Sequence, residues 1–416
     1  MNNIRYLKEV SEVITKGTTP TTVGGVFTDE GINFVKSESI CDSKYLDSSV
    51  FMKIDEETDE KLKRSRLQEG DLLFSIAGAY LGKISIVRAE DLPANTNQAV
   101  GIVRLKNELV DVSYLYYFFS QTQINSYINK LSAQSSQPNL NLDLLGRLSF
   151  NCLALDEQKK ISSILSAIDA KIELNNRINA ELEALAKTLY DYWFVQFDFP
   201  FDFASCPEQG RREGKPTANG KPYKSSGGKM VYNPILKREI PEGWEVAVVA
   251  EILGKTPASN KVLNQEILAD GSIPVIDQSQ DYICGFTDDI TALITPTQPH
   301  VVFGDHTRVV KLVNFEYARG ADGTQILLSN DARMPGYLLY QVVSDIDLSN
   351  YGYARHFKFL KDYKIILPNQ TIAARYHEVV APCYEKIKGG IFENQHLMRL
   401  RDWLLPMLMN GQVTVK

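Results

Sequence analysis

Short apolar runs separated by polar segments fill the first 155 residues of the chain. The runs of strand length are 70–76, 83–87, 99–105 and 148–153. A longer apolar pattern from Asp111 to Leu131 has the spacing of a helix. Strands and helices in this mixed order predict an α/β domain.

The second half of the chain repeats this order of elements. The matching segments are 299–305, 324–328, 336–343 and 363–367. Matched residues lie 229 positions apart at Phe74 and Phe303, and 227 apart at Gln98 and Gln325. Loops that vary independently in two copies would produce this drift. We predict a duplicated chain with a pseudo-twofold axis; the alternative is an accidental likeness between two unrelated α/β domains.

A heptad pattern follows each of the two domains. The first seam consists of Ile161, Leu165, Ile168, Ile172, Asn175, Asn179, Leu182, Ala186, Leu189 and Trp193. The same register in the second copy gives Tyr376, Val380, Cys383, Ile387, Gly390, Asn394, Leu397, Arg401, Leu404 and Leu408. Such spacing predicts a coiled-coil seam. A helix from Asp156 to Trp193 would be roughly 57 Å long at about 1.5 Å per residue, so it needs a partner helix. We expect the two helices to pack antiparallel.

Polar residues interrupt both seams. Asn175 and Asn179 would fix the register, because an amide without a partner is penalised in every other alignment. The alternative is that they mark a widened, hydrated stretch. Gly389 and Gly390 weaken the second helix, which predicts a kink there.

The pattern divides the chain into five predicted segments. These are a first domain at 1–155, a long helix at 156–198, a connector at 199–243, a second domain at 244–367, and a second long helix with a tail at 368–416. The connector is rich in glycine and proline, and residues 201–240 carry eight basic and four acidic side chains. Phosphate contact is one interpretation of this segment, and an irregular solvated linker is the favoured one.

Composition narrows the class of protein. The chain has 416 residues, 44% hydrophobic and 23% charged, as expected for folded globular domains. Its five cysteines form no paired motif, and no apolar stretch has the length of a membrane span, so we expect a cytoplasmic protein. The net charge of −6 means that any DNA binding must use local basic clusters or a basic partner.

The sequence carries no complete catalytic or metal-binding motif. The loop from Gly78 to Lys83 lacks the spacing and the hydroxyl of a nucleotide-binding loop, and the five histidines lack zinc-site spacing. The segment Asn233 to Leu236 lacks the aromatic ring that would stack on a flipped base. Asp305 and His306 could form an acid–base pair, but a binding role is favoured. We predict a protein without catalytic residues or a metal site.

Polar loops of the two domains are the candidate DNA contacts, because amide, hydroxyl and basic groups read bases and phosphates. In the first domain they are Lys61, Lys63, Arg64, Arg66, Ser135, Ser136, Gln137 and Asn139. In the second they are His306, Arg308, Tyr353, Arg355, His356 and Lys358. Ordinary solvated loops are the alternative for any one of these residues.

Several segments resemble a known family. They are Gly70 to Phe74 with Asn97-Gln98, the helix entry at Asp156-Glu157-Gln158, the aromatic stretch from Leu189 to Asp198, the turn from Tyr223 to Gly228, and Ile240 to Trp244. Together with the duplication, they resemble the specificity subunits of type I restriction-modification systems over essentially the whole chain.

The resemblance implies two mixed α/β target recognition domains separated by two long antiparallel coiled-coil helices. Each domain would read half of a split target in double-stranded DNA. The chain itself would be non-catalytic, and it would recruit two modification (methyltransferase) subunits and ATP-driven restriction subunits. S-adenosylmethionine, ATP and magnesium would then belong to those partners.

Two other functions remain open from the residues alone. A coiled-coil adaptor without a DNA role would bind its partner equally well with shuffled loops. A self-contained DNA methyltransferase would require cofactor binding by the purified chain.

Overall fold

The computed structural model describes residues 4–41, 43–78, 81–132, 139–201, 221–321, 323–352 and 355–415. The chain falls into two compact units. The first unit comprises Met1–Glu173 and Asn394–Lys416, and the second comprises Leu174–Glu393. Each long helix therefore contributes residues to both units, whereas the sequence predicted the helices as separate segments. None of the described helices is long and apolar enough to cross a membrane.

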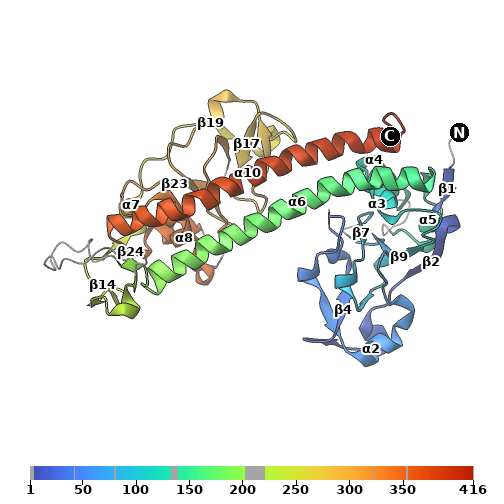
Figure 1. Ribbon diagram of the computed structural model, residues 1–416, viewed down its shortest axis with the longest axis horizontal. Helices are drawn as coiled ribbons and strands as arrows, with labels where there is room; N and C mark the ends of the chain where they lie inside the picture. Colours follow the sequence, from blue (N-terminus) through green and yellow to red (C-terminus); the bar gives the residue numbers. More distant parts are fainter. Residues whose placement is uncertain are drawn as a thin grey trace. The chain divides into compact units, whose positions relative to one another are not determined.

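The first unit contains two four-stranded sheets (Figure 1). One has the order β2 (Ser11–Lys16), β9 (Val100–Leu105), β6 (Leu72–Ser75), β7 (Ile84–Ile86), and the other has the order β3 (Phe27–Thr28), β5 (Met52–Ile54), β4 (Ile32–Val35), β8 (Ala94–Thr96). The first strand of the chain, β1 (Ile4–Tyr6), pairs antiparallel with the last strand of the domain, β10 (Ser149–Asn151). The shorter helices are α1 (Leu7–Val10), α2 (Glu56–Lys61), α3 (Val112–Ser120), α4 (Thr122–Ser132) and α5 (Leu142–Gly146).

Helix α3 shows how the sequence builds this core. Asp111 caps the helix by accepting a hydrogen bond from the Tyr114 amide at 2.8 Å. The side chains of Tyr114, Tyr117 and Phe119 are almost completely buried, and Phe119 packs edge-to-face on Phe74 of β6. The strongly apolar helix thus covers the sheet that contains β6.

The second unit contains a three-stranded and a five-stranded sheet. The smaller sheet has the order β21 (Val310–Val313), β20 (His300–Gly304), β23 (Thr324–Leu327). The larger has the order β16 (Lys261–Val262), β22 (Tyr317–Gly320), β17 (Ile273–Ile276), β18 (Gly285–Thr287), with β19 (Leu293–Ile294) also paired to β22. Three further antiparallel pairs are β15 (Glu245–Val248) with β24 (Lys364–Leu367), β11 (Pro200–Phe201) with β12 (Lys221–Pro222), and β13 (Met230–Asn233) with β14 (Arg238–Pro241). The shorter helices of this unit are α7 (Val249–Ile252), α8 (Gly336–Ser344) and α9 (His356–Lys361).

The two units repeat the same pairings, as the duplication predicted. Strand β6 lies between β7 and β9, and β20 lies between β21 and β23. Phe74 is paired with Gly101, and its counterpart Phe303 is paired with Gln325. Gln325 is therefore the counterpart of Gly101, and the predicted match of Gln98 with Gln325 is wrong by three residues. The cause is a difference in loop length before β9 and β23.

Helices α6 (Leu155–Tyr190) and α10 (Gln370–Met409) pack antiparallel in each unit. In the second unit Asn175 donates to the Glu393 carboxylate at 2.8 Å, and the Tyr376 hydroxyl donates to the Ala186 carbonyl at 3.1 Å. In the first unit the Arg401 guanidinium lies 3.1 Å from the Asp169 carboxylate. The predicted antiparallel seam is therefore confirmed within each unit.

The predicted seam residues are mostly buried. Ile161, Leu165, Ile168, Asn175, Val380, Ile387 and Asn394 are each less than one-tenth exposed, and Ile172, Asn179, Leu182, Leu189, Leu397 and Leu404 are partly buried. The helix ends are held by aromatic rings, since Trp193 and Phe194 both contact Tyr376 edge-to-face. These two rings belong to a π-helical turn, Asp191–Val195, that follows α6.

Helix α10 continues through Gly389 and Gly390 without a break. A Cβ added to Gly390 would lie 2.7 Å from Oδ1 of Asn179, whereas one added to Gly389 would meet open space. Gly390 therefore leaves room for the Asn179 side chain to approach the helix backbone. Oδ1 of Asn179 is buried without a hydrogen-bond partner among the described residues.

The ends of the predicted connector are ordered. Phe199 stacks on Tyr223 and on Trp244, and the Asp198 carboxylate accepts hydrogen bonds from the Ser225 amide and hydroxyl. Residues 202–220 of the connector lie outside the described residues. The aromatic stack attaches both ends of the connector to the core of the second unit.

Candidate nucleic-acid interface

Asp305 joins the two polar loops predicted in the second domain. Its backbone carbonyl accepts a hydrogen bond from the His356 amide at 2.9 Å, and its carboxylate accepts one from the Phe357 amide at 2.9 Å. The loop after β20 is therefore attached to the start of α9. These contacts bring His306 and Arg308 to the same edge of the unit as Arg355 and Lys358.

The four side chains on these two loops are exposed. They are His306, Arg308, Arg355 and Lys358. Arg308 adopts a positive φ of 63°, a conformation that non-glycine residues seldom adopt, and its amide donates to the Gly304 carbonyl at 2.8 Å. The tight turn leaves its guanidinium at the surface. Three cationic side chains on adjoining loops suit contact with a polyanion.

His356 does not fit the predicted DNA contact. Its side chain is only 2% exposed, and its ring nitrogens lie 3.0 Å from the Asp305 carbonyl and 3.1 Å from the Gly352 carbonyl. The ring is occupied in bridging two backbone segments, so it has no free edge to present to a base. His356 is a residue that positions the loops.

Gln278 supports the loop after β20 and was not predicted from the sequence. Its amide oxygen accepts a hydrogen bond from the His306 amide at 3.2 Å, and its carbonyl accepts one from the Thr307 hydroxyl at 2.7 Å. It belongs to the loop that follows the buried strand β17. The polar run Asp277 to Gln280 directly after four buried residues was the available signal.

A buried charge pair supports the same loop. Lys311 is 4% exposed, and its ammonium lies 3.7 Å from the Asp277 carboxylate. Burial lowers the pKa of Lys311, although the nearby Asp277 opposes this shift. Burial would raise the pKa of Asp277, but hydrogen bonds from Ser279 and the charge of Lys311 lower it on balance. The ion pair between Lys311 and Asp277 therefore attaches the start of the loop after β17 to β21.

The corresponding edge of the first unit has the same construction. Asn139 forms a β-bridge with Ala77, and the Leu140 amide donates to the Ile76 carbonyl at 2.9 Å. The loop after β6 is therefore held against the segment that precedes α5. Asn139 is exposed at this edge. The other predicted contacts, Ser135, Ser136, Gln137 and Tyr353, lie outside the described residues.

Acidic neighbours pair with most of the predicted basic cluster of the first unit. Lys61 lies 2.8 Å from Glu57, Arg66 lies 2.7 Å from Asp59, and Lys63 lies 3.7 Å from Glu60. Asp59 also accepts a hydrogen bond from the buried Asn95, so Arg66 is part of a structural network. Arg64 is exposed and forms no ion pair in the described part of the chain. It is the member of the cluster best placed to contact a phosphate.

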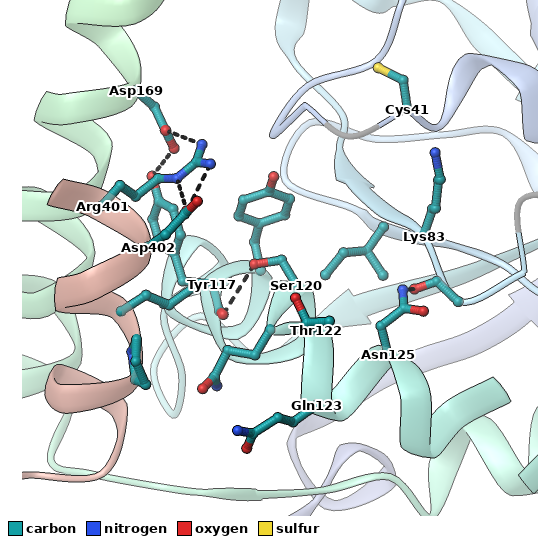
Figure 2. Close-up of a pocket in the computed structure, with 16 residues that line it drawn as sticks. Cys41, Lys83, Tyr117, Ser120, Thr122, Gln123, Asn125, Asp169, Arg401 and Asp402 are labelled. Atoms are coloured by element: carbon teal, nitrogen blue, oxygen red, sulfur yellow. Dashed lines mark hydrogen bonds and ion pairs between the residues drawn. The ribbon is translucent and has the colours of Figure 1, made fainter. Parts of the chain in front are cut away.

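A polar cavity of about 400 Å³ lies between the first domain and its part of the helix pair (Figure 2). Asp169 of α6 forms an ion pair with Arg401 of α10 and accepts a hydrogen bond from the Tyr117 hydroxyl of α3. Burial and this hydrogen bond raise the pKa of Tyr117. The network connects all three helices, so its visible role is structural.

Among the described residues, no group of three or more histidine, cysteine, aspartate or glutamate side chains could hold a metal ion. The residue Asp305 is only 6% exposed, and its carboxylate accepts a hydrogen bond from the Phe357 amide, which favours a structural role for Asp305 over an acid–base pair with His306. The arrangement presents hydrogen-bonding groups and charges on loops, which suits recognition.

Comparisons with known proteins show what this chain is similar to. Residues 2–184 match the type I restriction modification DNA specificity domain. The chain is 24% identical to the type I restriction enzyme MjaIX specificity subunit of Methanocaldococcus jannaschii, covering 100% of this chain and 94% of that protein. It is 22% identical to the HindI specificity subunit of Haemophilus influenzae, covering 84% and 88%.

A solved structure shares the fold. The S subunit of a type I restriction-modification system from M. genitalium superposes with a TM-score of 0.56 at 14% sequence identity, covering 98% of this chain and 96% of that one. The arrangement of sheets and long helices therefore occurs in a protein with little sequence in common.

Proposed function

Because residues 2–184 match the type I restriction modification DNA specificity domain, we propose that this chain is the DNA-reading, non-catalytic specificity subunit of a type I restriction-modification complex. Each unit would read one half of a bipartite target in double-stranded DNA. Base choice would come from side chains on the loops at the sheet edge, as hydrogen bonds in the major groove distinguish all base pairs.

One observation carries this proposal. The two units hold matching strands in matching pairings, yet the loops at the equivalent edges differ in residue type. The first edge offers Asn139, whereas the second offers His306, Arg308, Arg355 and Lys358. A common framework with different polar loops is what reading two different short sequences requires.

The long helices would set the gap between the half-sites. Seam contacts such as Asn175 with Glu393 fix the register of α6 against α10, so the helices would act as a spacer of defined length. The target would then consist of two specified blocks separated by a fixed number of unspecified base pairs.

Partner subunits would supply the chemistry. Two modification subunits would carry S-adenosylmethionine and methylate the DNA, and restriction subunits would use ATP and magnesium. The net charge of −6 supports this division, because the chain carries 51 acidic against 45 basic side chains and phosphate neutralisation needs an excess of basic ones. A basic partner would provide much of that surface.

The test is methylome sequencing of a host that expresses this chain together with its modification partner. We expect methylation at one split motif. Arg355→Ala should relax the bases of one half-site and leave the other unchanged, since each good bidentate contact contributes about 1–3 kcal/mol of discrimination. Lys386→Ala changes an exposed cation on α10 and serves as the matched control.

Two outcomes would count against the proposal. Uniform weakening on all sequences would assign Arg355 to the DNA backbone rather than to base reading. Unchanged partner binding together with no DNA binding, even after the loops of both units are shuffled, would instead indicate a coiled-coil adaptor.

A further inference from the structure

A second cavity, of about 290 Å³, lies within the second unit between β21, helix α8 and the helix pair. Its position corresponds to that of the first unit's cavity. Tyr340 of α8 is the counterpart of Tyr116 of α3, because both helices have nine residues and the same place after the sheet. Tyr384 of α10 is the counterpart of Asp169 of α6 by the repeat register.

The bond between the domain helix and the long helix is conserved in position but not in chemistry. Tyr117 donates to Asp169 in the first unit, and Gln341 donates to the Tyr384 hydroxyl at 2.7 Å in the second. Each cavity therefore lies beside an equivalent hydrogen bond between the domain helix and a long helix. The residues that line the two cavities can be compared position by position.

Acidic and aromatic groups line the second cavity. Glu183 projects from α6, and Tyr282, Tyr340 and Tyr384 contribute their rings, with Tyr340 and Tyr384 edge-to-face at 6.0 Å. Part of the Glu183 side chain is exposed, but desolvation of its carboxyl raises its pKa. Burial raises the pKa of all three tyrosines, and the charge of Glu183, which lines the same cavity, adds to each shift.

The other charged groups at this cavity are already paired. Lys388 forms an ion pair with Glu385, which also accepts a hydrogen bond from Asn314 at 3.0 Å. Lys311 is paired with Asp277 at 3.7 Å. In the described part of the chain, Glu183 has no ion pair, so the cavity carries one uncompensated carboxylate beside aromatic rings.

The first unit shows what such a cavity accepts. There the guanidinium of Arg401 lies 3.1 Å from the carboxylate of Asp169 (Figure 2), in a cavity that Tyr116 and Tyr117 also line. The repeat register places Ala186 of α6 where α10 has Arg401, so the second cavity lacks this internal arginine. A carboxylate with tyrosine rings is suited to a guanidinium, which pairs with the one and stacks on the other.

We propose that the cavity formed by Glu183, Tyr282, Tyr340 and Tyr384 binds a guanidinium group from outside the chain. The group is either the end of an arginine side chain on a partner protein or a free guanidino compound. In both cases the positive charge of the guanidinium would pair with the Glu183 carboxylate, and the flat face of the guanidinium would stack on a tyrosine ring.

The probe is N-acetyl-arginine amide, titrated into the full-length chain and followed by saturation-transfer NMR. N-acetyl-citrulline amide, which has the same shape without the charge, is the comparison ligand. We expect saturable binding of the arginine probe, and Glu183→Gln should weaken it by roughly two- to fivefold, as expected for loss of an ion pair with an exposed side chain. Glu181→Gln alters an exposed carboxylate of α6 outside the cavity lining and should leave binding unchanged.

Equal binding of the arginine and citrulline probes would overturn the proposal, as would an unaltered affinity in Glu183→Gln. Assembly with the modification subunit then identifies the source of the guanidinium. Weaker assembly of Glu183→Gln supports an arginine of that partner, and unaltered assembly with weaker probe binding supports a free guanidino compound. The probe titration needs neither DNA nor a partner, so it is independent of the proposed function.

Discussion

Adjacent glycines in α10 provide a test of the helix seam with a built-in control. A Cβ at Gly389 would meet open space, whereas a Cβ at Gly390 would lie 2.7 Å from Oδ1 and 3.0 Å from Nδ2 of Asn179. Replacing glycine by alanine inside a helix stabilises it by about 1 kcal/mol. Gly389→Ala should therefore stabilise the second unit by about that amount.

Gly390→Ala gains the same propensity but must displace Asn179. Overpacking of a close contact costs roughly 1–3 kcal/mol, so this variant should be less stable than Gly389→Ala by at least about 1 kcal/mol. The difference corresponds to about 2–4 °C in the unfolding midpoint for a unit of this size. Circular dichroism at 222 nm during thermal unfolding of the full chain measures it.

A double substitution identifies the cause. In an Asn179→Ala background the obstacle is absent, so Gly390→Ala should recover the stabilisation seen at Gly389. If Gly390→Ala stabilises the original chain as much as Gly389→Ala does, Asn179 does not abut the α10 backbone and the argument for the seam geometry is wrong.

Three further outcomes are expected. Burial lowers the pKa of His300 to about 4, so the unfolded state binds a proton at a higher pH than the folded state does. The free energy of unfolding of the second unit should therefore fall by about 3 kcal/mol between pH 6.5 and a pH below 4. Urea unfolding across this range should show the fall, and His300→Phe should remove it. Asp305→Ala removes the acceptor of the Phe357 amide at 2.9 Å and should lower the free energy of unfolding by about 1–3 kcal/mol. Methylome sequencing should show weaker recognition of the half-site read by the second unit and unchanged recognition of the other. Equal losses at both half-sites would contradict a local role for Asp305. Deleting one heptad from α6 alone shortens it by about 10 Å, close to three base pairs of duplex, and should disturb the gap or the assembly; full affinity for the original gap would refute the spacer idea.

The sequence predicted the long helices and their partnership, because a heptad seam is a strong periodic signal. It predicted the central strands as well, since β6 and β20 are short, wholly buried runs. It did not predict strands such as β3 and β16, which have two residues each and are defined by their partners rather than by a local pattern. Both β3 and β16 lie at an edge of their sheets.

Candidate site residues were predicted less well than the fold. The sequence identified the loops that carry Arg308 and Arg355, because polar residues beside a buried strand mark the end of a sheet. It misassigned His356, whose neighbours are polar in sequence while its ring lies between two backbone carbonyls. It missed Gln278, because contacts with His306 and Thr307 across 28 and 29 positions leave no local trace.

The pairing of β1 with β10, and of β15 with β24, brings the start and the end of each domain side by side. The Leu7 amide donates to the Leu148 carbonyl at 2.9 Å, and the Val249 amide donates to the Tyr363 carbonyl at 3.0 Å. The two ends of each domain therefore lie next to each other, and from there the chain continues into a long helix. Under the proposed function, recombination at these paired strands would replace one whole domain and leave the long helices unaltered. The DNA sequence preferred at one half-site would then change in one step.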